Sequence, residues 1–231
     1  MEVKVLKENK NSDLLVVTPL LPSHKISRDT KVTIKRNQLP FTWISVSDNQ
    51  NIPTNVQNGL DWFRKEHHKP KYILPLDNDV ILGRNMIDRM YNNIEGVKHG
   101  AIAYTYANFK FQGSVNAEFP ARPFDIKKII EHNYISSNSM IKVTCLDRVG
   151  GFVMDDQYKR LLDWCLWLKF LYHGYVGLAS PNASFVAISS SDSVSDGSDM
   201  DYNVKRNRVL KDFVEPLYEK FGKDKSVNDN E

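Results

Sequence analysis

The chain has 231 residues, of which 41% are hydrophobic and 26% are charged, and its net charge is +3. This composition is typical of a globular protein with a real core, and the length predicts a single α/β domain over residues 1–231. The weak positive charge, without long basic clusters, argues against a nucleic-acid-binding protein.

Three apolar runs alternate with helical patterns in the first half of the chain. Residues 14–18, 41–46 and 72–76 are short and rich in apolar residues, which predicts strands. Apolar residues at helical spacing predict amphipathic helices at 51–70 and 86–96. This alternation, with a polar helix-compatible segment between the first two strands, predicts a mostly parallel sheet flanked by crossover helices.

The second half follows a less regular pattern. We expect strands at 101–112, 134–143 and 183–188, with a short helical piece between the first two. A glycine turn at 149–152 precedes a strongly apolar helix at 161–174, and another helix is expected near 204–221. Residues 189–199 have the composition of a mobile loop, and residues 222–231 are expected to be a disordered tail.

Polar residues follow the first three predicted strands: Thr18, Asp48, and the pair Asp77 and Asp79. In parallel sheets, ligands bind beyond the carboxyl ends of the strands. We therefore expect these side chains to converge on one edge of the sheet and to form a binding site there.

The sequence Asp77-Asn78-Asp79 has two interpretations. Alternate carboxylates at a strand end suit a hard divalent cation such as Mg²⁺ or Mn²⁺. Asp and Asn are also favoured turn residues, so the same letters describe a simple turn. The buried strand before them and the neighbouring strand ends favour the metal site. Asp48 is explained equally by a turn and by a hydrogen bond to a nucleoside base or ribose.

Asp163 lies in the apolar segment LLDWCLWLKFLYHG, where an unpaired carboxylate would be costly to bury. Two compatible roles explain it. It caps a helix that starts at Trp164, or it faces a cleft as a general base. The six histidines have no zinc-type spacing. The sequence also lacks GxSxG, GxxxxGK[ST] and GxGxxG motifs, which argues against serine hydrolases, P-loop kinases and common dinucleotide enzymes.

Cys145 and Cys165 lie in apolar stretches and form no CxxC pair, so we expect buried free thiols and a reducing compartment. No run approaches the roughly 20 apolar residues needed for a transmembrane segment. The N-terminal stretch MEVKVLKENKNSD lacks the apolar core of a signal peptide. These observations predict a cytoplasmic protein.

The order of these motifs resembles the GT-A glycosyltransferases of the family-2 type, from about residue 14 to residue 187. The resemblance rests on LLVVTP, ISVSD, NIPTNVQNGL, LPLDND, and VGGF followed by LLDWCLWLKFLYHG. It implies a GT-A type, Rossmann-like sheet in one domain. Residues 14–112 would form the nucleotide-sugar-binding half, and residues 113–200 a mixed acceptor and catalytic half.

The resemblance also implies residue roles. Asp163 matches the catalytic aspartate, Asp79 the more direct metal ligand, and Asp77 a metal or ribose ligand. Gly150 and Gly151 would shape the sugar and acceptor pocket. The positions implied to contact the nucleotide sugar are Thr18, Pro19, Asp48, Asn55, Asn58, Asp77, Asn78 and Gly151.

Two departures from the family pattern stand out. Leu162 replaces the acidic residue that often precedes the catalytic aspartate. The region after the last predicted strand, AISSSDSVSDGSD, has no histidine near the metal. The third metal ligand is therefore open between Asp192 and coordination by the diphosphate and waters alone.

The resemblance implies a hexosyltransferase that depends on Mn²⁺ or Mg²⁺ and inverts the anomeric centre. Its donor would be a nucleoside-diphosphate sugar, such as UDP-glucose, and its acceptor a hydroxyl of a glycan or glycoprotein. One alternative is a sugar-1-phosphate nucleotidyltransferase, although TPLLPSHKISRD lacks the glycines expected after its first strand. Another is a non-catalytic carbohydrate- or nucleotide-binding module.

Overall fold

The computed structural model describes the whole chain except residues 10, 49, 115, 190–200 and 223–231. Its strands are β1 (Glu2–Lys7), β2 (Leu14–Leu20), β3 (Thr42–Ser47), β4 (Tyr72–Pro75), β5 (Val80–Leu82), β6 (Ile102–Gly113), β7 (Ala117–Phe119), β8 (Met140–Lys142) and β9 (Val176–Ser189). Its α-helices are α1 (Arg28–Thr33), α2 (Ile52–Glu66), α3 (Met86–Gly96), α4 (Ile126–Glu131), α5 (Val143–Arg148), α6 (Leu162–Tyr172), α7 (Tyr202–Val209) and α8 (Glu215–Phe221). A π-helical stretch, Leu210–Val214, joins α7 to α8, and short 3-10 turns lie at Ile34–Arg36 and Asp156–Tyr158.

One mixed sheet contains all nine strands found in the described part of the chain, in the order β1-β3-β2-β4-β8-β6-β9-β5, with β7 paired to β6. The parallel arrangement predicted for the first half is confirmed, because β2 pairs in parallel with both β3 and β4. The long β6–β9 pairing is also parallel. The pairings of β1, β5, β7 and β8 are antiparallel, so the parallel character is confined to these three pairings.

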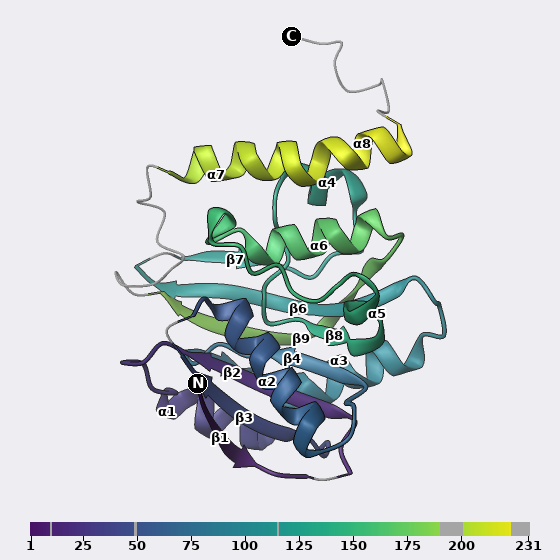
Figure 1. The fold of residues 1–231 in the computed structure, drawn as a ribbon. Coiled ribbons are helices and arrows are strands. Elements are labelled where there is room, and N and C mark those ends of the chain that lie inside the picture. The colour runs from purple at the N-terminus through teal and green to yellow at the C-terminus, as the bar shows by residue number, and fades with distance from the viewer. Residues whose placement is uncertain (10, 49, 115, 190–200, 223–231) are drawn as a thin grey trace.

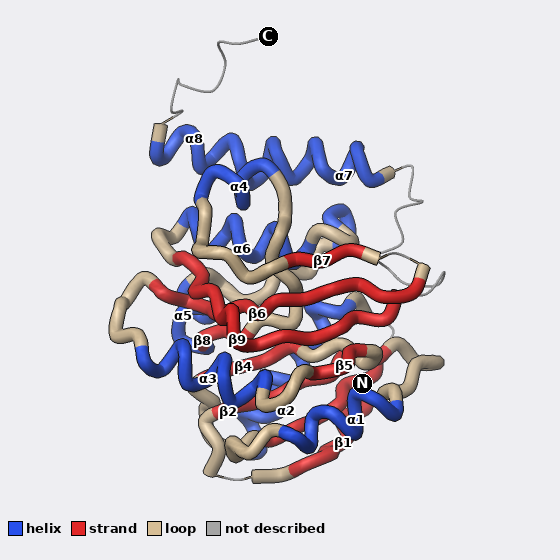
Figure 2. The backbone as a smooth tube through the Cα atoms, turned by 180° about the vertical axis from the view of Figure 1, so that it is seen from behind, coloured by secondary structure: helices blue, strands red, loops and turns tan. Residues whose placement is uncertain are grey.

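Helices cover both faces of the sheet (Figures 1 and 2). Successive residues of a strand point to opposite faces, and β2 buries both sets. Leu15 and Val17 pack in the cluster that contains α2, α5 and α6, whereas Leu14 and Val16 pack in the cluster that contains α3. Helix α6 is itself buried, because α4 and α8 contact it from outside. The strands are therefore apolar on both faces, as expected for a sheet enclosed between helices.

Helix α2 lies directly against the parallel strands because Gly59 allows it to approach closely. A Cβ atom at this position would lie 2.9 Å from side-chain atoms of both Val17 and Val46. The helix begins where Asn51 accepts a hydrogen bond from the backbone N–H of Thr54 at 2.9 Å, a normal N-cap interaction. Its start is thereby fixed next to the carboxyl ends of β2 and β3.

The second half differs from the sequence prediction in several places. Only residues 140–142 of the expected strand at 134–143 are a strand, and α5 begins at Val143. The last strand is longer than expected, since β9 starts at Val176. Strands β1, β5 and β7 were not predicted, because each is short or largely polar. The first residue of the loop predicted at 189–199, Ser189, is instead the last residue of β9, and the rest of that loop and most of the predicted tail lie outside the described residues.

The edge strand β1 pairs with β3 and is mostly exposed. Its pairing contains an irregularity between Val5 and Lys7, where the register shifts. Within the described part of the chain, no helix is long and apolar enough to cross a membrane.

Candidate active site

The predicted acidic turn connects two buried strands at the carboxyl edge of the parallel core. Strand β4 ends at Pro75, and β5 begins at Val80. Because β5 pairs antiparallel with β9, the chain must change direction within the four residues between β4 and β5. Asp77, Asn78 and Asp79 occupy this turn, and all three are partly buried.

Asp77 is held by a side chain from the second half of the molecule. Asn138 donates through Nδ2 to Asp77 Oδ2 at 2.7 Å, and its Oδ1 accepts from the Asp77 backbone N–H at 2.8 Å. Burial and the nearby charge of Asp79 together raise the pKa of Asp77 to about 6, against the hydrogen bonds from Asn138 and Ser137. The Asp77 carboxylate is thus held in one orientation, although burial and the charge of Asp79 disfavour its ionised form.

Asp79 has a raised pKa because of burial, which a backbone hydrogen bond and the nearby imidazole of His24 oppose. The loop that carries His24 is fastened to the same turn. Asn78 donates through Nδ2 to the carbonyl of Lys25 at 3.0 Å, and the carbonyl of Asn78 accepts from the backbone N–H of Ser27 at 2.8 Å. The segment after β2 therefore brings His24 and Lys25 to the acidic turn.

Asp163 lies in the first turn of α6, which begins at Leu162 rather than at Trp164. Its Oδ1 accepts from the backbone N–H of Trp164 at 2.8 Å, and its Oδ2 accepts from Asn133 Nδ2 at 2.9 Å. Asp163 is therefore not the residue that precedes the helix, although it does satisfy an N–H group of the first turn. Burial raises the pKa of Asp163 to about 6 against these bonds, and the charge of Asp77 adds to the rise.

The three carboxyl groups come from two elements, the turn after β4 and helix α6, and Asp77 is coupled to both of the others. Asp77 interacts electrostatically with both Asp79 and Asp163. Such mutual repulsion is relieved by protonation or by a cation, and two carboxylates at a strand end suit Mg²⁺ or Mn²⁺. Asp77 and Asp79 thus fit a divalent cation as a pair of ligands.

Asp163 stands apart from that pair. Among the residues that the structure describes, no three His, Cys, Asp or Glu side chains lie together in a way that could hold a metal ion. The described residues therefore offer only Asp77 and Asp79 as carboxylate ligands, and the third ligand stays open between Asp192 and a bound diphosphate with waters. Asp192, the third ligand considered from the sequence, lies outside the described residues.

The other residues predicted to bind the donor differ in their burial: some lie in the core, and others are partly exposed. Strand β2 continues to Leu20, so Thr18 and Pro19 are buried within it instead of ending it. The hydroxyl of Thr18 accepts from the indole N–H of Trp43 at 2.9 Å and points into the core. Asp48 directly follows β3 and is partly exposed, with the amino group of Met1 3.6 Å from its carboxylate.

Asn55 and Asn58 lie on the first turns of α2. Asn55 is fully buried and donates through Nδ2 to the carbonyl of Leu20 at 3.2 Å, which ties the helix to the end of β2. Its Oδ1 has no hydrogen-bond partner. Asn58 is partly exposed on the same helix. The bond of Asn55 to Leu20 is structural, and its implied contact with the nucleotide sugar stays a prediction.

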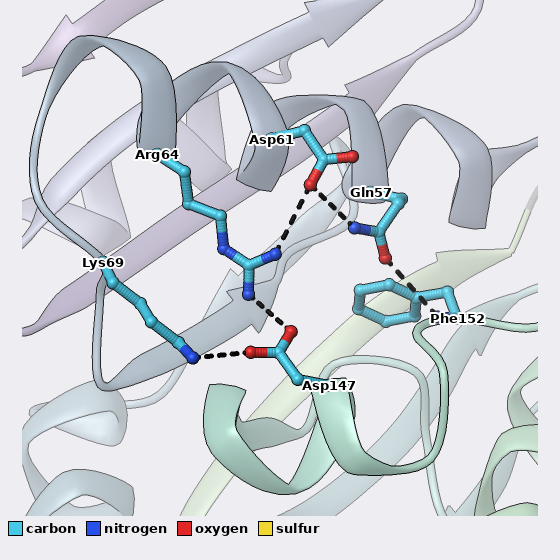
Figure 3. A network of polar contacts seen from close by, with 6 residues as sticks. All are labelled: Gln57, Asp61, Arg64, Lys69, Asp147 and Phe152. Carbon is cyan, nitrogen blue, oxygen red and sulfur yellow. Dashed lines mark hydrogen bonds and ion pairs between the residues drawn. The ribbon is translucent and has the colours of Figure 1, made fainter.

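The glycine turn packs against α2, as Figure 3 shows for Gln57 and Phe152. Gly151 has a φ of +80°, and a Cβ there would lie 3.0 Å from Gln57 Oε1. Both the backbone conformation and the space favour glycine. The same face of α2 carries Asp61 and Arg64, whose guanidinium binds Asp147 of α5 at 2.6 Å (Figure 3).

Sequence reasoning missed Asn133, Asn138 and His24 as site residues. Asn138 was hidden because residues 134–143 were assigned to a strand, and Asn133 directly precedes that predicted strand. The available signal was composition, since NYISSNS is rich in the Asn and Ser that are typical of turns. His24 gave no signal, because only the fold brings its loop to Asp79.

No family model matches the chain, and no curated protein matches it by sequence. Solved structures match by fold. S. aureus TarS covers 89% of this chain at 13% identity, with a TM-score of 0.49. S. aureus TarS 1-349 covers 76% at 14% identity, with a TM-score of 0.50. This chain spans only 43% and 60% of those two chains.

A third match is the mannosyltransferase PcManGT from Pyrobaculum calidifontis, solved in complex with GDP-Man and Mn²⁺. It covers 93% of this chain and 68% of its own, at 12% identity and a TM-score of 0.50. At this identity the likeness concerns the fold alone. The chain therefore has a mixed α/β fold similar to that of a glycosyltransferase.

Proposed function

We propose that this protein is a glycosyltransferase that moves a sugar from a nucleoside-diphosphate sugar to an acceptor hydroxyl. The observation that carries the proposal is the pair Asp77 and Asp79 in the turn at the carboxyl edge of the parallel strands, together with Asp163, which is electrostatically coupled to Asp77. The fold similarity to a mannosyltransferase that binds GDP-Man and Mn²⁺ supports it. The donor half is assigned to residues 14–112 and the acceptor half to residues 113–200, within a single domain over residues 1–231.

Asp163 acts as the general base in this proposal. Its carboxylate takes the proton of the acceptor hydroxyl while the acceptor oxygen forms a bond to the anomeric carbon of the sugar. The bond between that carbon and the diphosphate oxygen breaks, and its electron pair leaves with the nucleoside diphosphate. One displacement inverts the anomeric centre. Asp163 then releases its proton to solvent.

Asp77 and Asp79 would hold Mn²⁺ or Mg²⁺, which stabilises the negative charge that grows on the departing diphosphate. The loop that carries His24 and Lys25 is fastened to Asn78 and lies beside this pair. Asp48, Asn58, Asn78 and Gly151 are assigned to the rest of the donor, with UDP-glucose as the first candidate. The acceptor is a glycan or glycoprotein. We also place the protein in the cytoplasm, which its two buried free cysteines support.

The test is donor turnover with Mn²⁺ and a panel of UDP-, GDP- and other nucleotide sugars, followed by release of nucleoside diphosphate. Release that depends on Mn²⁺ is the expected result. Pyrophosphate release from a nucleoside triphosphate and a sugar phosphate would instead identify a nucleotidyltransferase. Binding without turnover, across a fair panel of acceptors, would identify a non-catalytic module.

A further inference from the structure

One connector holds two of the three acidic residues of the site. Residues 132–139 join α4 to β8, and residues 134–139 of this connector were expected to be part of a strand. Asn138 in this connector bonds Asp77, and Asn133 bonds Asp163. In the proposed reaction the two aspartates have different roles: Asp77 would help to hold the metal at the leaving diphosphate, and Asp163 would act as the base at the acceptor hydroxyl. The connector is therefore the physical link between the two aspartates.

The contact of Asn138 with Asp77 is reciprocal and buried. Asn138 is only 2% exposed, and its amide makes one bond to the side chain and one to the backbone of the same residue. Such a pair fixes both the position and the rotation of the carboxylate. Because Asp77 Oδ2 accepts the hydrogen bond from this amide, the direction of Asp77 Oδ1 is fixed as well.

The contact of Asn133 with Asp163 is a single hydrogen bond, made by a partly buried amide whose oxygen is held by the connector itself. Asn133 donates to Asp163 Oδ2, and its own Oδ1 accepts from the backbone N–H of Ile135 at 3.0 Å. The amide cannot turn around without losing that second bond, because its oxygen and nitrogen have opposite roles. The direction of the hydrogen bond toward Asp163 is therefore set by the connector backbone.

The connector is anchored at both ends. Trp167 of α6 donates through its indole N–H to the carbonyl of Ile135 at 3.1 Å. On the other side, β8 pairs antiparallel with β4, the strand that leads to Asp77. Within the connector, Ser139 Oγ donates to the carbonyl of Ser136 at 2.7 Å. A continuous set of contacts thus runs from β4 to α6.

We propose that Asn133 and Asn138 are positioning residues that set the placement of the base relative to the metal-binding aspartate. This inference rests on the proposed function. In-line displacement requires the acceptor oxygen, the anomeric carbon and the leaving oxygen to be aligned. A shift of about 1 Å in such an arrangement can cost on the order of 10²-fold in rate. Two amides on one rigid connector prevent such a shift.

The experiment compares Asn138→Ala and Asn133→Ala with Asn37→Ala as a matched control. Asn37 is also buried, accepts a backbone N–H from Ile87 at 2.8 Å and donates to the carbonyl of Ile34 at 3.0 Å. It lies on the side of the sheet that carries α3, away from the acidic residues. The control therefore reports what losing a buried amide does to folding alone.

The expected results differ for the two variants. Asn138→Ala weakens binding of UDP or GDP in the presence of Mn²⁺ by about 10- to 100-fold, the usual effect of removing a group that orients a metal ligand. Asn133→Ala keeps that binding and lowers kcat for nucleoside diphosphate release by about 10²-fold. The inference is overturned if both variants match Asn37→Ala in binding and kcat at equal thermal stability.

A further measurement needs no substrate. Carbon-13 NMR of the aspartate carboxyls follows the titration of Asp163 in the wild type and in Asn133→Ala. Loss of the donor should move this titration to higher pH, because the bond favours the charged carboxylate. An unchanged titration overturns the positioning role of Asn133. If the wild type neither binds nor turns over any nucleotide sugar, the proposed function fails, and the NMR result still decides whether Asn133 orients Asp163.

Discussion

The charge of Asp77 raises the pKa of Asp163, although the two residues come from opposite halves of the chain. Burial is the larger cause, and together they bring the pKa of Asp163 to about 6. A carboxylate with such a pKa is ionised at neutral pH yet holds a proton more strongly than an exposed aspartate does. Both properties suit a general base.

Replacing Asp163 with Asn should abolish transfer while preserving donor binding. The amide cannot accept the proton of the acceptor hydroxyl, and a positioned base contributes about 10²- to 10⁴-fold to rate. Nucleoside diphosphate release measures transfer, and calorimetry with UDP or GDP and Mn²⁺ measures binding. Normal turnover by Asp163→Asn would show that another group takes the proton.

The pH dependence of transfer should show an acid limb near pH 6. Asp163 must be deprotonated to act as a base, and its pKa is raised to about 6. Activity should therefore rise as the pH increases through this region and should be nearly lost at pH 4.5. Initial rates between pH 4.5 and 8, with saturating donor and acceptor, provide the check. An acid limb near pH 4 would contradict the raised pKa.

Replacing Asp77 with Asn should stabilise the metal-free protein at neutral pH. The pKa of Asp77 is raised to about 6 when folded, so the folded state binds protons more tightly than the unfolded state. The ionised group therefore destabilises the fold fully above pH 6 and not at all below the unfolded pKa. The gain from Asp77→Asn should be about 1–3 kcal/mol at pH 7.5. At pH 4 it should largely vanish.

Urea unfolding in the presence of EDTA measures this difference. Asn138 can still donate to an amide oxygen at position 77, so the orienting bond is retained in the variant. A stability gain that is equal at pH 4 and pH 7.5 would mean that the charge of Asp77 is not its cause.

Replacing Asp79 with Ala should remove the dependence of donor binding on the metal. The variant loses one of only two carboxylates in the turn, so Mn²⁺ affinity in the presence of UDP or GDP should fall at least 10-fold. Asp13→Ala is the control, because Asp13 is exposed just before β2 begins, at the opposite end of the strand. Equal losses in both variants would point to a general effect of charge.

The parts of the fold that sequence reasoning predicted are those with a local cause. Strands β2, β3 and β4 are apolar runs bounded by turn residues, and α2 and α3 carry apolar residues at helical spacing. Strand β5 has only three residues and exists because β9 lies beside it. Strand β1 has charged residues among apolar ones, and it is a strand because it pairs with the edge of β3. Such tertiary causes leave little trace in a local pattern.

The residues of the candidate site also fall into those that a local pattern predicts and those that depend on tertiary contacts. Asp77, Asp79 and Asp163 could be found because carboxylates next to apolar runs are costly and need a reason. Thr18 was assigned to a strand end, but β2 continues through Pro19. The pairing of β2 with β4 stops at Val17, so Pro19 needs no hydrogen bond on that side. Asn133 and Asn138 depend on contacts between distant segments, which composition alone does not reveal.

The exposed edge strand β1 has a consequence for how copies of this protein meet. An open strand edge is a template for pairing with another chain, which leads to aggregation. In β1, Lys4 and Lys7 place positive charges on this edge, and the register shift between Val5 and Lys7 interrupts its regular hydrogen-bonding pattern. The interrupted pattern makes regular pairing of two such edges unfavourable. The neighbour of β1 in the sheet is β3, which is almost wholly buried. By pairing with β3, this short charged strand keeps the hydrogen-bonding edge of β3 from pairing with neighbouring molecules.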